Sequence, residues 1–268
     1  MPGSSARVAA PLLRRLVGLA ALFAALFAAS PPASAQVKVI ISGGFTAAYR
    51  ELLPQFEKET GMTVTTTSGG SVGNGPNTIG GQIRRGVPAD VVILAREGLR
   101  DLIAEGRTVP GTDRDLGRSI IGMVVRAGAP KPDISTVERF KQALLAAKTV
   151  AVPGSTGGLY LLNEVLPRLG IADKLTIRVT ARGSESAELV ASGEANLAIQ
   201  PASELLHVAG VEFVGPLPLG VQLVQVFAGG VVVGSKNARM AKQLIAFLAS
   251  DRASTALSAN GMERPPAR

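Results

Sequence analysis

The chain alternates two kinds of apolar pattern along most of its length. Short runs rich in β-branched or continuous apolar residues cover 37–41, 62–67 and 89–95. Between the first two, from Phe45 to Phe56, apolar residues recur at intervals of three and four, which is typical of one face of a helix. Short runs of this kind predict strands. Regular alternation of strand and helix predicts an α/β architecture built on parallel sheets.

The same alternation continues through the second half of the chain. It predicts further strands at 120–126, 148–152, 175–180, 196–200 and 211–214, and a long apolar segment at 221–233. It predicts helices at 77–85, 97–105, 136–147, 184–193, 237–249 and 251–259, a further helix that ends at Leu169 and a short one through Leu206. About ten strands are many for one open sheet. We therefore expect two lobes, one formed by 36–117 with 231–268 and the other by 118–230, with crossovers near 118–126 and 221–233.

Residues 1–35 have the order of segments found in a secretory signal peptide. Basic residues at Arg7, Arg14 and Arg15 precede an apolar run over 16–29, and small residues follow up to Ala35. The run is shorter than the roughly 20 residues that a membrane span needs. We therefore predict cleavage after Ala35, export to the periplasm and a mature chain that starts at Gln36.

The composition excludes several classes of site. The chain has no Cys and one His, His207, so thiolate or multi-histidine metal sites and cysteine nucleophiles cannot form. It has no Trp and only 2 Tyr, and its 28 Lys and Arg are scattered among 20 Asp and Glu. Stacking platforms and a basic stripe for nucleic acid are therefore lacking. We expect no metal, no cofactor and no nucleic-acid partner.

Three glycine- and serine-rich turns lie where predicted strands lead into helices or loops. They are Ser42-Gly43-Gly44, Ser68-Gly69-Gly70-Ser71 and Ser155-Thr156-Gly157-Gly158. Glycine allows a ligand to approach the backbone, and N–H groups at a helix start favour an anion. In open α/β sheets, ligands bind outside the carboxyl ends of strands. Each turn could instead cap its helix only, but three together predict a donor-rich anion site.

Four segments resemble the solute-binding proteins of ABC transporters, the two-lobed type II periplasmic binding proteins that include molybdate binders. The segments are 39–56, 86–95, 154–160 and 241–250. The resemblance implies that each lobe is a mostly parallel sheet flanked by helices, and that an anion binds in the cleft between the lobes without a cationic side chain. The candidate ligand-binding residues are Ser42, Gly43, Gly44, Gly70, Ser71, Ser155, Thr156, Gly157 and Gln200.

Two positions depart from the molybdate binders of that family. Gly44 stands where they have serine, and Gln200-Pro201 stands where they have a tyrosine. These departures argue against molybdate itself, and the amide of Gln200 suits a carboxylate or a carbonyl.

The segments 125–135 and 200–206 resemble the aconitate isomerase branch of the same family. This resemblance implies transfer of an allylic proton on a small tricarboxylate, which needs a base and carboxylate donors. Candidate donors are Arg84, Arg85 and Arg182; the candidate bases are Glu185, Glu204 and His207. Asp90 follows a turn and precedes a buried run, so we expect it to accept hydrogen bonds from a helix start or a loop.

Two functions therefore remain open. In the first, the protein is a monomeric periplasmic clamp that closes on a small anion, a molybdate-like oxyanion or a small carboxylate, and delivers it to an ABC transporter permease in the inner membrane. In the second, the same clamp is an enzyme that interconverts cis- and trans-aconitate. Both rest on a hinged cleft that prefers its ligand in the closed state.

Overall fold

The structure is a computed structural model that describes residues 36–73 and 75–266. The predicted signal peptide at 1–35 lies outside the described residues and stays a prediction. Residues Gln36–Arg268 form one compact unit. Among the described residues, no helix combines the length and the apolar character that crossing a bilayer requires.

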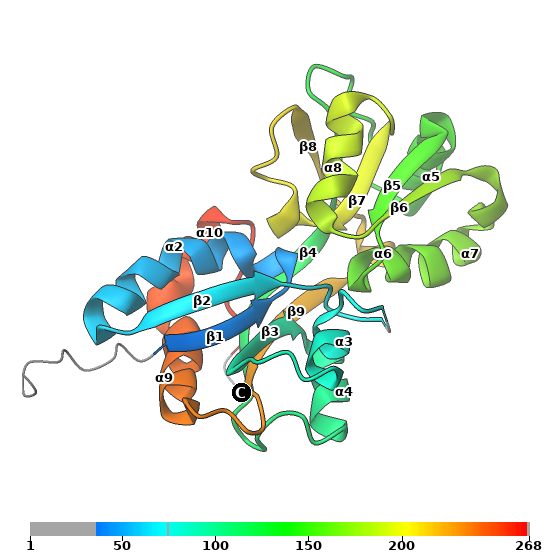
Figure 1. Cartoon of the computed structure of the whole chain (residues 1–268). Helices are drawn as coiled ribbons and strands as arrows, with labels where there is room; N and C mark the ends of the chain where they lie inside the picture. Colours follow the sequence, from blue (N-terminus) through cyan, green and yellow to red (C-terminus); the bar gives the residue numbers. More distant parts are fainter. Residues whose placement is uncertain (1–35, 74, 267–268) are drawn as a thin grey trace, which may run out of the picture. The chain divides into compact units, whose positions relative to one another are not determined.

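The first lobe is built on a mixed sheet with strand order β2-β1-β3-β9-β4 (Figure 1). Its strands are β1 (Gln36–Ile41), β2 (Thr63–Ser68), β3 (Val91–Ala95), β4 (Arg114–Arg126) and β9 (Val224–Val231). One face is covered by α2 (Gly43–Thr60), α9 (Ala238–Leu248), the 3₁₀ turn η5 (Asp251–Ala253) and α10 (Ser254–Ala259). The other face is covered by α3 (Ile79–Arg84) and α4 (Arg96–Ala104).

Burial on both faces explains the apolar runs that the sequence shows. Side chains alternate across a strand, so Val39 and Ile41 pack against α2 while Ile40 packs against α3 and α4. Every residue of β3 is buried. This is the pattern expected for strands enclosed by helices on both sides.

The second lobe likewise has helices on both faces of a sheet, which is built around the C-terminal half of β4. Its other strands are β5 (Thr149–Pro153), β6 (Thr176–Thr180), β7 (Leu197–Pro201) and β8 (Val211–Pro216). One face packs against α5 (Val137–Ala147), α6 (Thr156–Tyr160), the π-helical turn η1 (Leu161–Val165) and α7 (Leu166–Leu169); the other packs against α8 (Gly183–Ser192). Short 3₁₀ turns are η2 (Ala172–Lys174), η3 (Ala202–Glu204) and η4 (Leu219–Val221).

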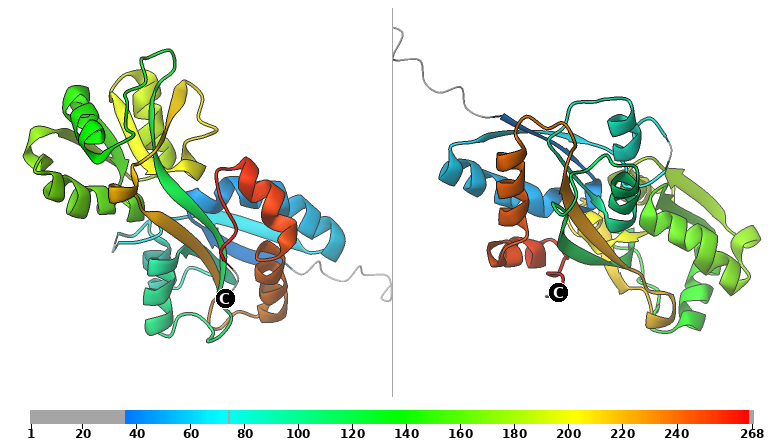
Figure 2. Two further views of the ribbon diagram at one scale, coloured as in Figure 1. Left: turned by 180° about the vertical axis from the view of Figure 1, so that it is seen from behind. Right: turned by 90° about the horizontal axis from the view of Figure 1, so that it is seen from below.

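One strand, β4, belongs to both sheets. From Arg114 to Ile120 it pairs antiparallel with β9, and from Ile121 onward it pairs antiparallel with β7 and β8. Both β4 and β9 run from one lobe toward the other (Figure 2). Among the named strands of the described residues, parallel pairing joins β1 to β2 and β3, and β5 to β6 and β7. The predicted lobe limits at 117/118 and 230/231 remain a prediction.

Most elements expected from the sequence are confirmed. The helix begun near Phe45 ends at Gly61, whose φ is 67°, and the Thr136 hydroxyl accepts a hydrogen bond from Arg139 N at 3.2 Å to cap α5. Two expectations were wrong. Strand β4 starts at Arg114 rather than Ile120 because polar and glycine residues pair there with β9. The helix expected over 251–259 is divided into η5 and α10.

Gly158 lets α6 pack directly on the end of β5, and its replacement tests this contact. A Cβ atom at Gly158 would overlap the backbone carbonyl oxygen of Pro153. We expect Gly158→Ala to lower the free energy of unfolding by about 2–3 kcal/mol, measured by urea denaturation.

The matched control is Gly80→Ala in α3, where a Cβ atom would approach only the flexible end of Arg84. Alanine favours the helix, so this variant should be neutral or up to about 1 kcal/mol more stable. Equal effects of the two substitutions would contradict the packing argument.

Candidate functional site

A cavity of about 800 Å³ lies between helices and turns of the two sheets. We call it the central cleft. Its lining comes from the segments that follow the carboxyl ends of β1, β2, β5, β6 and β7, together with the last residue of β2 and two residues of β9. Those residues are Ser42, Gly43, Gly44, Thr46, Ala47, Arg50, Ser68, Gly69, Gly70, Ser71, Asn77, Gln82, Arg85, Val87, Ser155, Ala181, Arg182, Gly183, Ser184, Glu185, Glu204, Gln225 and Phe227. This is the place where open α/β sheets bind ligands.

The start of α2 presents unpaired donors to the cleft. Ser42 is 3% exposed, and its Oγ has no hydrogen-bond partner among the described residues. The N–H groups of Gly43 and Gly44 likewise have no acceptor within the described residues. Since α2 is 18 residues long, its N-terminal dipole adds to these donors. A negatively charged group would satisfy them.

An aromatic ring packs directly against the backbone of Gly44. A Cβ atom at Gly44 would overlap the ring of Phe227, a residue of β9 that also lines the cleft. A serine at this position would therefore displace the ring. At this position the cleft therefore presents a hydrocarbon surface.

The second predicted turn contributes fewer free backbone N–H groups than the sequence suggested. Gly69 N donates to Ile41 O at 3.1 Å, and Gly70 N donates to Asn77 O at 3.1 Å, so both groups are already paired. Ser71 Oγ accepts from Ala95 N at 3.0 Å and keeps its own proton available to donate. Gly70 and Ser71 do line the cleft.

The third predicted turn is divided between the cleft and the core. Ser155 lines the cleft, whereas Thr156 and Gly157 do not. A Cβ atom at Gly157 would lie 2.9 Å from the Ile121 side chain and 3.3 Å from Pro201. Thr156 Oγ1 is buried without a partner among the described residues.

Gln200 is buried beneath the cleft and is not a lining residue. Its side chain is inaccessible to solvent, and Nε2 donates to the backbone oxygen of Glu204 at 3.2 Å. The amide thus holds η3 in place. The binding roles of the nine candidate residues remain predictions.

A fourth strand-to-helix junction, at the start of α8, also contributes backbone to the cleft. The sequence analysis did not predict this contribution. Gly183 and Ser184 line the cleft beside Arg182 and Glu185. The segment follows a strand and carries glycine and serine, as the segment at 42–44 does, and this likeness could have revealed it. The cleft therefore receives the N-termini of two long helices, α2 and α8.

Glu185 and Glu204 have opposite electrostatic environments. Arg182 Nε donates to Glu185 Oε1 at 2.7 Å, and this hydrogen bond, with backbone donors from Arg182 and Ala181, lowers the pKa of Glu185. The Glu204 carboxyl forms no ion pair or hydrogen bond with another described residue. Desolvation by burial raises the pKa of Glu204 from 4.5 to about 7. Glu185 therefore stays ionised at neutral pH, while Glu204 can change its protonation state there.

The Glu204 carboxyl is wedged between the first turns of α2 and α8. A Cβ atom at Gly43 would overlap Glu204 Oε1, and one at Gly183 would overlap Oε2. The carboxyl thus occupies the space that a side chain at either glycine would take. The contact brings one element of each lobe to the same functional group.

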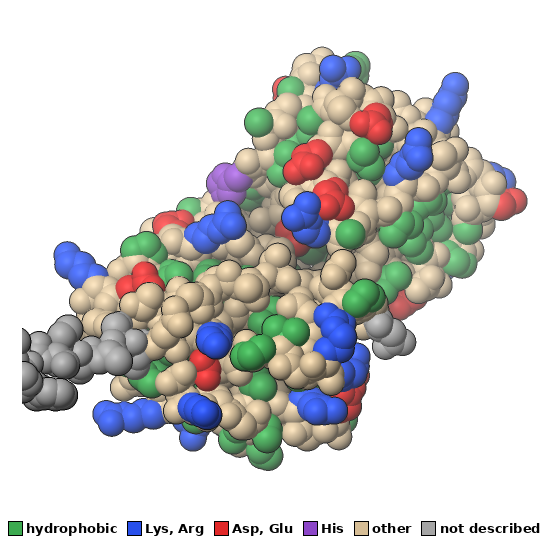
Figure 3. Space-filling view, viewed as in Figure 1, with side chains coloured by type: hydrophobic (Ala, Val, Ile, Leu, Met, Phe, Trp, Pro, Cys, Tyr) green, Lys and Arg blue, Asp and Glu red, His purple; other side chains and the backbone are tan. Residues whose placement is uncertain are grey.

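Arginines give the cleft an excess of positive charge. Arg50, Arg85 and Arg182 line it, whereas Arg84 points elsewhere and makes an exposed ion pair with Glu105 at 2.6 Å. This differs from the expectation of a cleft without cationic side chains. His207 is exposed and does not line the cleft. Elsewhere on the face drawn in Figure 3, basic and acidic side chains are interspersed.

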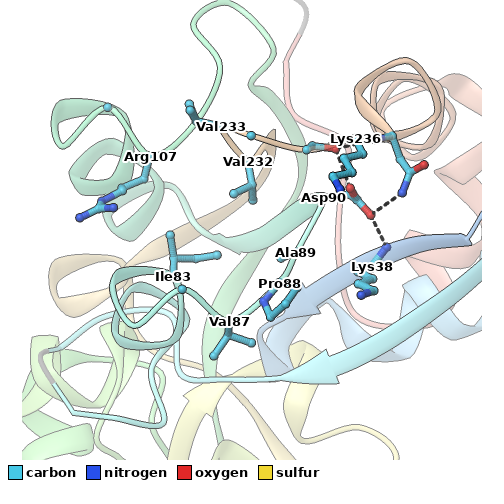
Figure 4. A pocket seen from close by; sticks show the side chains of 15 residues that line it. Lys38, Ile83, Val87, Pro88, Ala89, Asp90, Arg107, Val232, Val233 and Lys236 are labelled. Carbon is cyan, nitrogen blue, oxygen red and sulfur yellow. Dashed lines mark hydrogen bonds between the residues drawn. The ribbon is translucent and has the colours of Figure 1, made fainter.

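A second cavity, of about 530 Å³, surrounds Asp90 on the first lobe (Figure 4). Asp90 accepts hydrogen bonds from Lys38 N at 2.8 Å, from Ser235 Oγ at 2.6 Å and from Asn237 Nδ2 at 3.2 Å. The expectation that Asp90 accepts hydrogen bonds from a helix start or a loop is therefore confirmed. Within the described residues, no cluster of acidic or histidine side chains could hold a metal ion.

Comparison with known proteins identifies the family. A profile of the family described as bacterial extracellular solute-binding protein matches residues 37–263. An aconitate isomerase of Pseudomonas sp is 36% identical over 253 residues, which cover 92% of this chain and 97% of that protein. The molybdate-binding protein ModA of Escherichia coli (strain K12) is 26% identical over 76% of this chain and 79% of its own length. The chain belongs to the bacterial extracellular solute-binding protein family.

Solved structures agree on the fold. The periplasmic molybdate-binding protein of Azotobacter vinelandii superimposes with a TM-score of 0.68 at 21% identity, covering 85% of this chain and 99% of that one. The fold is therefore the two-lobed α/β fold of type II periplasmic binding proteins. The chain is a solute-binding protein of this fold.

The half-buried position of Glu204 between the starts of α2 and α8 predicts a pH-dependent effect on stability. The folded protein holds the Glu204 proton more tightly than the unfolded chain, so stability contributed by this group falls as pH rises from about 4.5 to about 7. We expect Glu204→Gln to raise the unfolding free energy at pH 8 by about 1–3 kcal/mol and the melting temperature by roughly 3–8 °C.

At pH 4 the two proteins should melt at nearly the same temperature, because Glu204 is then protonated in both states. Glu188→Gln, an exposed substitution on α8, is the control and should show no such pH dependence. A stability gain for Glu204→Gln that is equal at both pH values would contradict the assignment.

Proposed function

We propose that this protein is a periplasmic receptor that binds a small carboxylate anion in the central cleft and delivers it to an ABC transporter permease of the inner membrane. One observation carries the proposal: unpaired N–H groups at the start of α2, the buried Ser42 hydroxyl and three arginines line the same cavity. Donors left unpaired in a buried site are costly unless a ligand or water satisfies them. The protein acts as a monomer and needs no cofactor and no nucleic acid.

The lining favours an organic anion over a metal oxyanion. Arginine pairs with carboxylates through two parallel hydrogen bonds, and the Phe227 ring offers a surface for carbon atoms. A compact oxyanion would leave that ring and the more distant arginines without contact. The ligand class is therefore a small di- or tricarboxylate.

Ligand capture follows from the hinge geometry. Strands β4 and β9 connect the two lobes, and a ligand that touches both α2 and α8 interacts more strongly with the closed arrangement. The closed complex is then the form that the permease recognises. The transporter partner and the periplasmic location belong to this proposal.

A second function is favoured by a specific observation. Glu204, whose pKa is raised to about 7, lies in the same cleft as the arginines. A relative of 36% identity is an aconitate isomerase. In this alternative, the protein converts a bound unsaturated tricarboxylate into its geometric isomer.

A thermal-shift panel separates the ligand classes. We expect citrate, cis-aconitate or trans-aconitate, at about 100 times its dissociation constant, to raise the melting temperature by roughly 5–10 °C, because a ligand that binds only the folded state stabilises it. Molybdate, tungstate and sulfate serve as comparison anions. A shift with molybdate and none with a carboxylate would refute the carboxylate proposal.

Two neighbouring arginines provide a matched pair for binding measurements. We expect Arg85→Gln to weaken binding of the shifting carboxylate by about 10- to 100-fold, since Arg85 lines the cleft. Arg84→Gln removes only the exposed pair with Glu105 and should leave the affinity unchanged. Isothermal titration calorimetry measures both affinities. Equal losses of affinity in the two variants would contradict a direct contact between Arg85 and the ligand.

A further inference from the structure

The structure distinguishes the three side chains that the sequence analysis named as candidate bases. His207 is exposed and lies outside the central cleft. Glu185 lines the cleft, but its carboxylate accepts hydrogen bonds from the Arg182 side chain and from Ala181 N and Arg182 N. Glu204 lines the cleft with both carboxyl oxygens unengaged by the other described residues. Only Glu204 combines access to a ligand with the freedom to take a proton.

Rigid neighbours fix the position of Glu204. Gln200 Nε2 donates to its backbone oxygen, and Ser203 N donates to Ser119 Oγ of β4 at 3.2 Å. Ser119 Oγ in turn donates to Gly261 O at 3.0 Å. The turn η3 is therefore attached to the shared strand and to the C-terminal segment. An acid–base group needs this kind of support to stay within reach of the reacting atom.

The surroundings of the Glu204 carboxyl suit the charge changes of proton transfer. Gly43 and Gly183 place the starts of α2 and α8 against its two oxygens. The other charged groups that line the cleft are Arg50 on α2, Arg85 after α3, and Arg182 and Glu185 at α8. A carbanion whose charge spreads onto ligand carboxylates would be stabilised by these arginines and helix ends.

We infer that Glu204 is the acid–base residue of the central cleft and moves a proton between two carbon atoms of a bound unsaturated tricarboxylate. The inference rests on the proposed binding of a carboxylate in this cleft. It assigns one residue and one chemical step to the isomerase alternative.

The step balances without a further reactant. The Glu204 carboxylate takes a proton from the methylene carbon next to the double bond, and the electron pair of that C–H bond forms a new C=C bond. The former π pair moves to the far vinylic carbon, which receives the proton from the Glu204 carboxylic acid. The carboxylate is restored, and methylene and vinylic positions have exchanged. In aconitate the carbon skeleton is symmetric, so this exchange can yield the other geometric isomer.

An isotope experiment with the full-length protein tests the step. The probe is cis-aconitate with ¹³C at the methylene carbon, followed by ¹³C NMR. We expect the label to appear at the vinylic carbon of trans-aconitate. A label that stays on methylene carbon in the product would indicate rotation about the double bond and would overturn the inference.

Substitution of Glu204 tests the residue. We expect Glu204→Gln to lower kcat by at least about 100-fold without raising KM or reducing the thermal shift by aconitate, because general acid–base catalysis contributes about 10²- to 10⁴-fold. His207→Ala is the control and should keep wild-type kcat. In the wild-type protein, kcat/KM should rise with pH through a midpoint near 7, since the base must be deprotonated.

The outcomes distinguish the two proposals. If no tricarboxylate raises the melting temperature, the proposed binding function fails, and this inference fails with it. If aconitate binds but is not converted, or if Glu204→Gln keeps wild-type kcat, only the assignment of Glu204 is overturned. Unchanged kcat/KM between pH 5 and 8 would also overturn it.

Discussion

The division of one strand between two sheets governs the rest of this structure. Strand β4 pairs with β9 up to Ile120 and with β7 from Ile121, so the hydrogen-bond ladder passes from one lobe to the other at a single point. Pro201, at the end of β7, lies opposite Ile121 at that point, and η3 with Glu204 follows directly. The Glu204 carboxyl group therefore lies at the junction of the lobes, where β4 changes from one sheet to the other.

Glycines shape the central cleft by leaving room rather than by special backbone angles. Gly43, Gly44 and Gly183 all have ordinary φ values, yet a Cβ atom at each would overlap another side chain. Glu204 fills the space beside Gly43 and Gly183, and Phe227 fills the space beside Gly44. Each glycine therefore belongs to a pair with a residue distant in sequence. Changing the glycine alone would alter the cleft through that partner.

The cleft combines a feature that an anion receptor requires with one that it does not. Helix starts and arginines supply positive potential, while the one unengaged carboxyl, Glu204, opposes it. An acidic group in an anion site weakens binding when it is ionised and can exchange a proton when its pKa is near 7. This pairing links the proposed carboxylate ligand to the proposed chemistry at the same site. Either function uses closure of the lobes over the ligand.

The sequence by itself determined the α/β class, most strands and helices, and the turns at Ser42 and Ser155, because hydrophobic period and glycine content are local properties. It could not decide that Gly70 N is already paired, that Gln200 lies beneath the cleft, or that Arg85 lines it while Arg84 does not. It also left Glu185, Glu204 and His207 equivalent as bases. Those distinctions depend on burial and on contacts between residues far apart in the chain, which only the tertiary structure brings together.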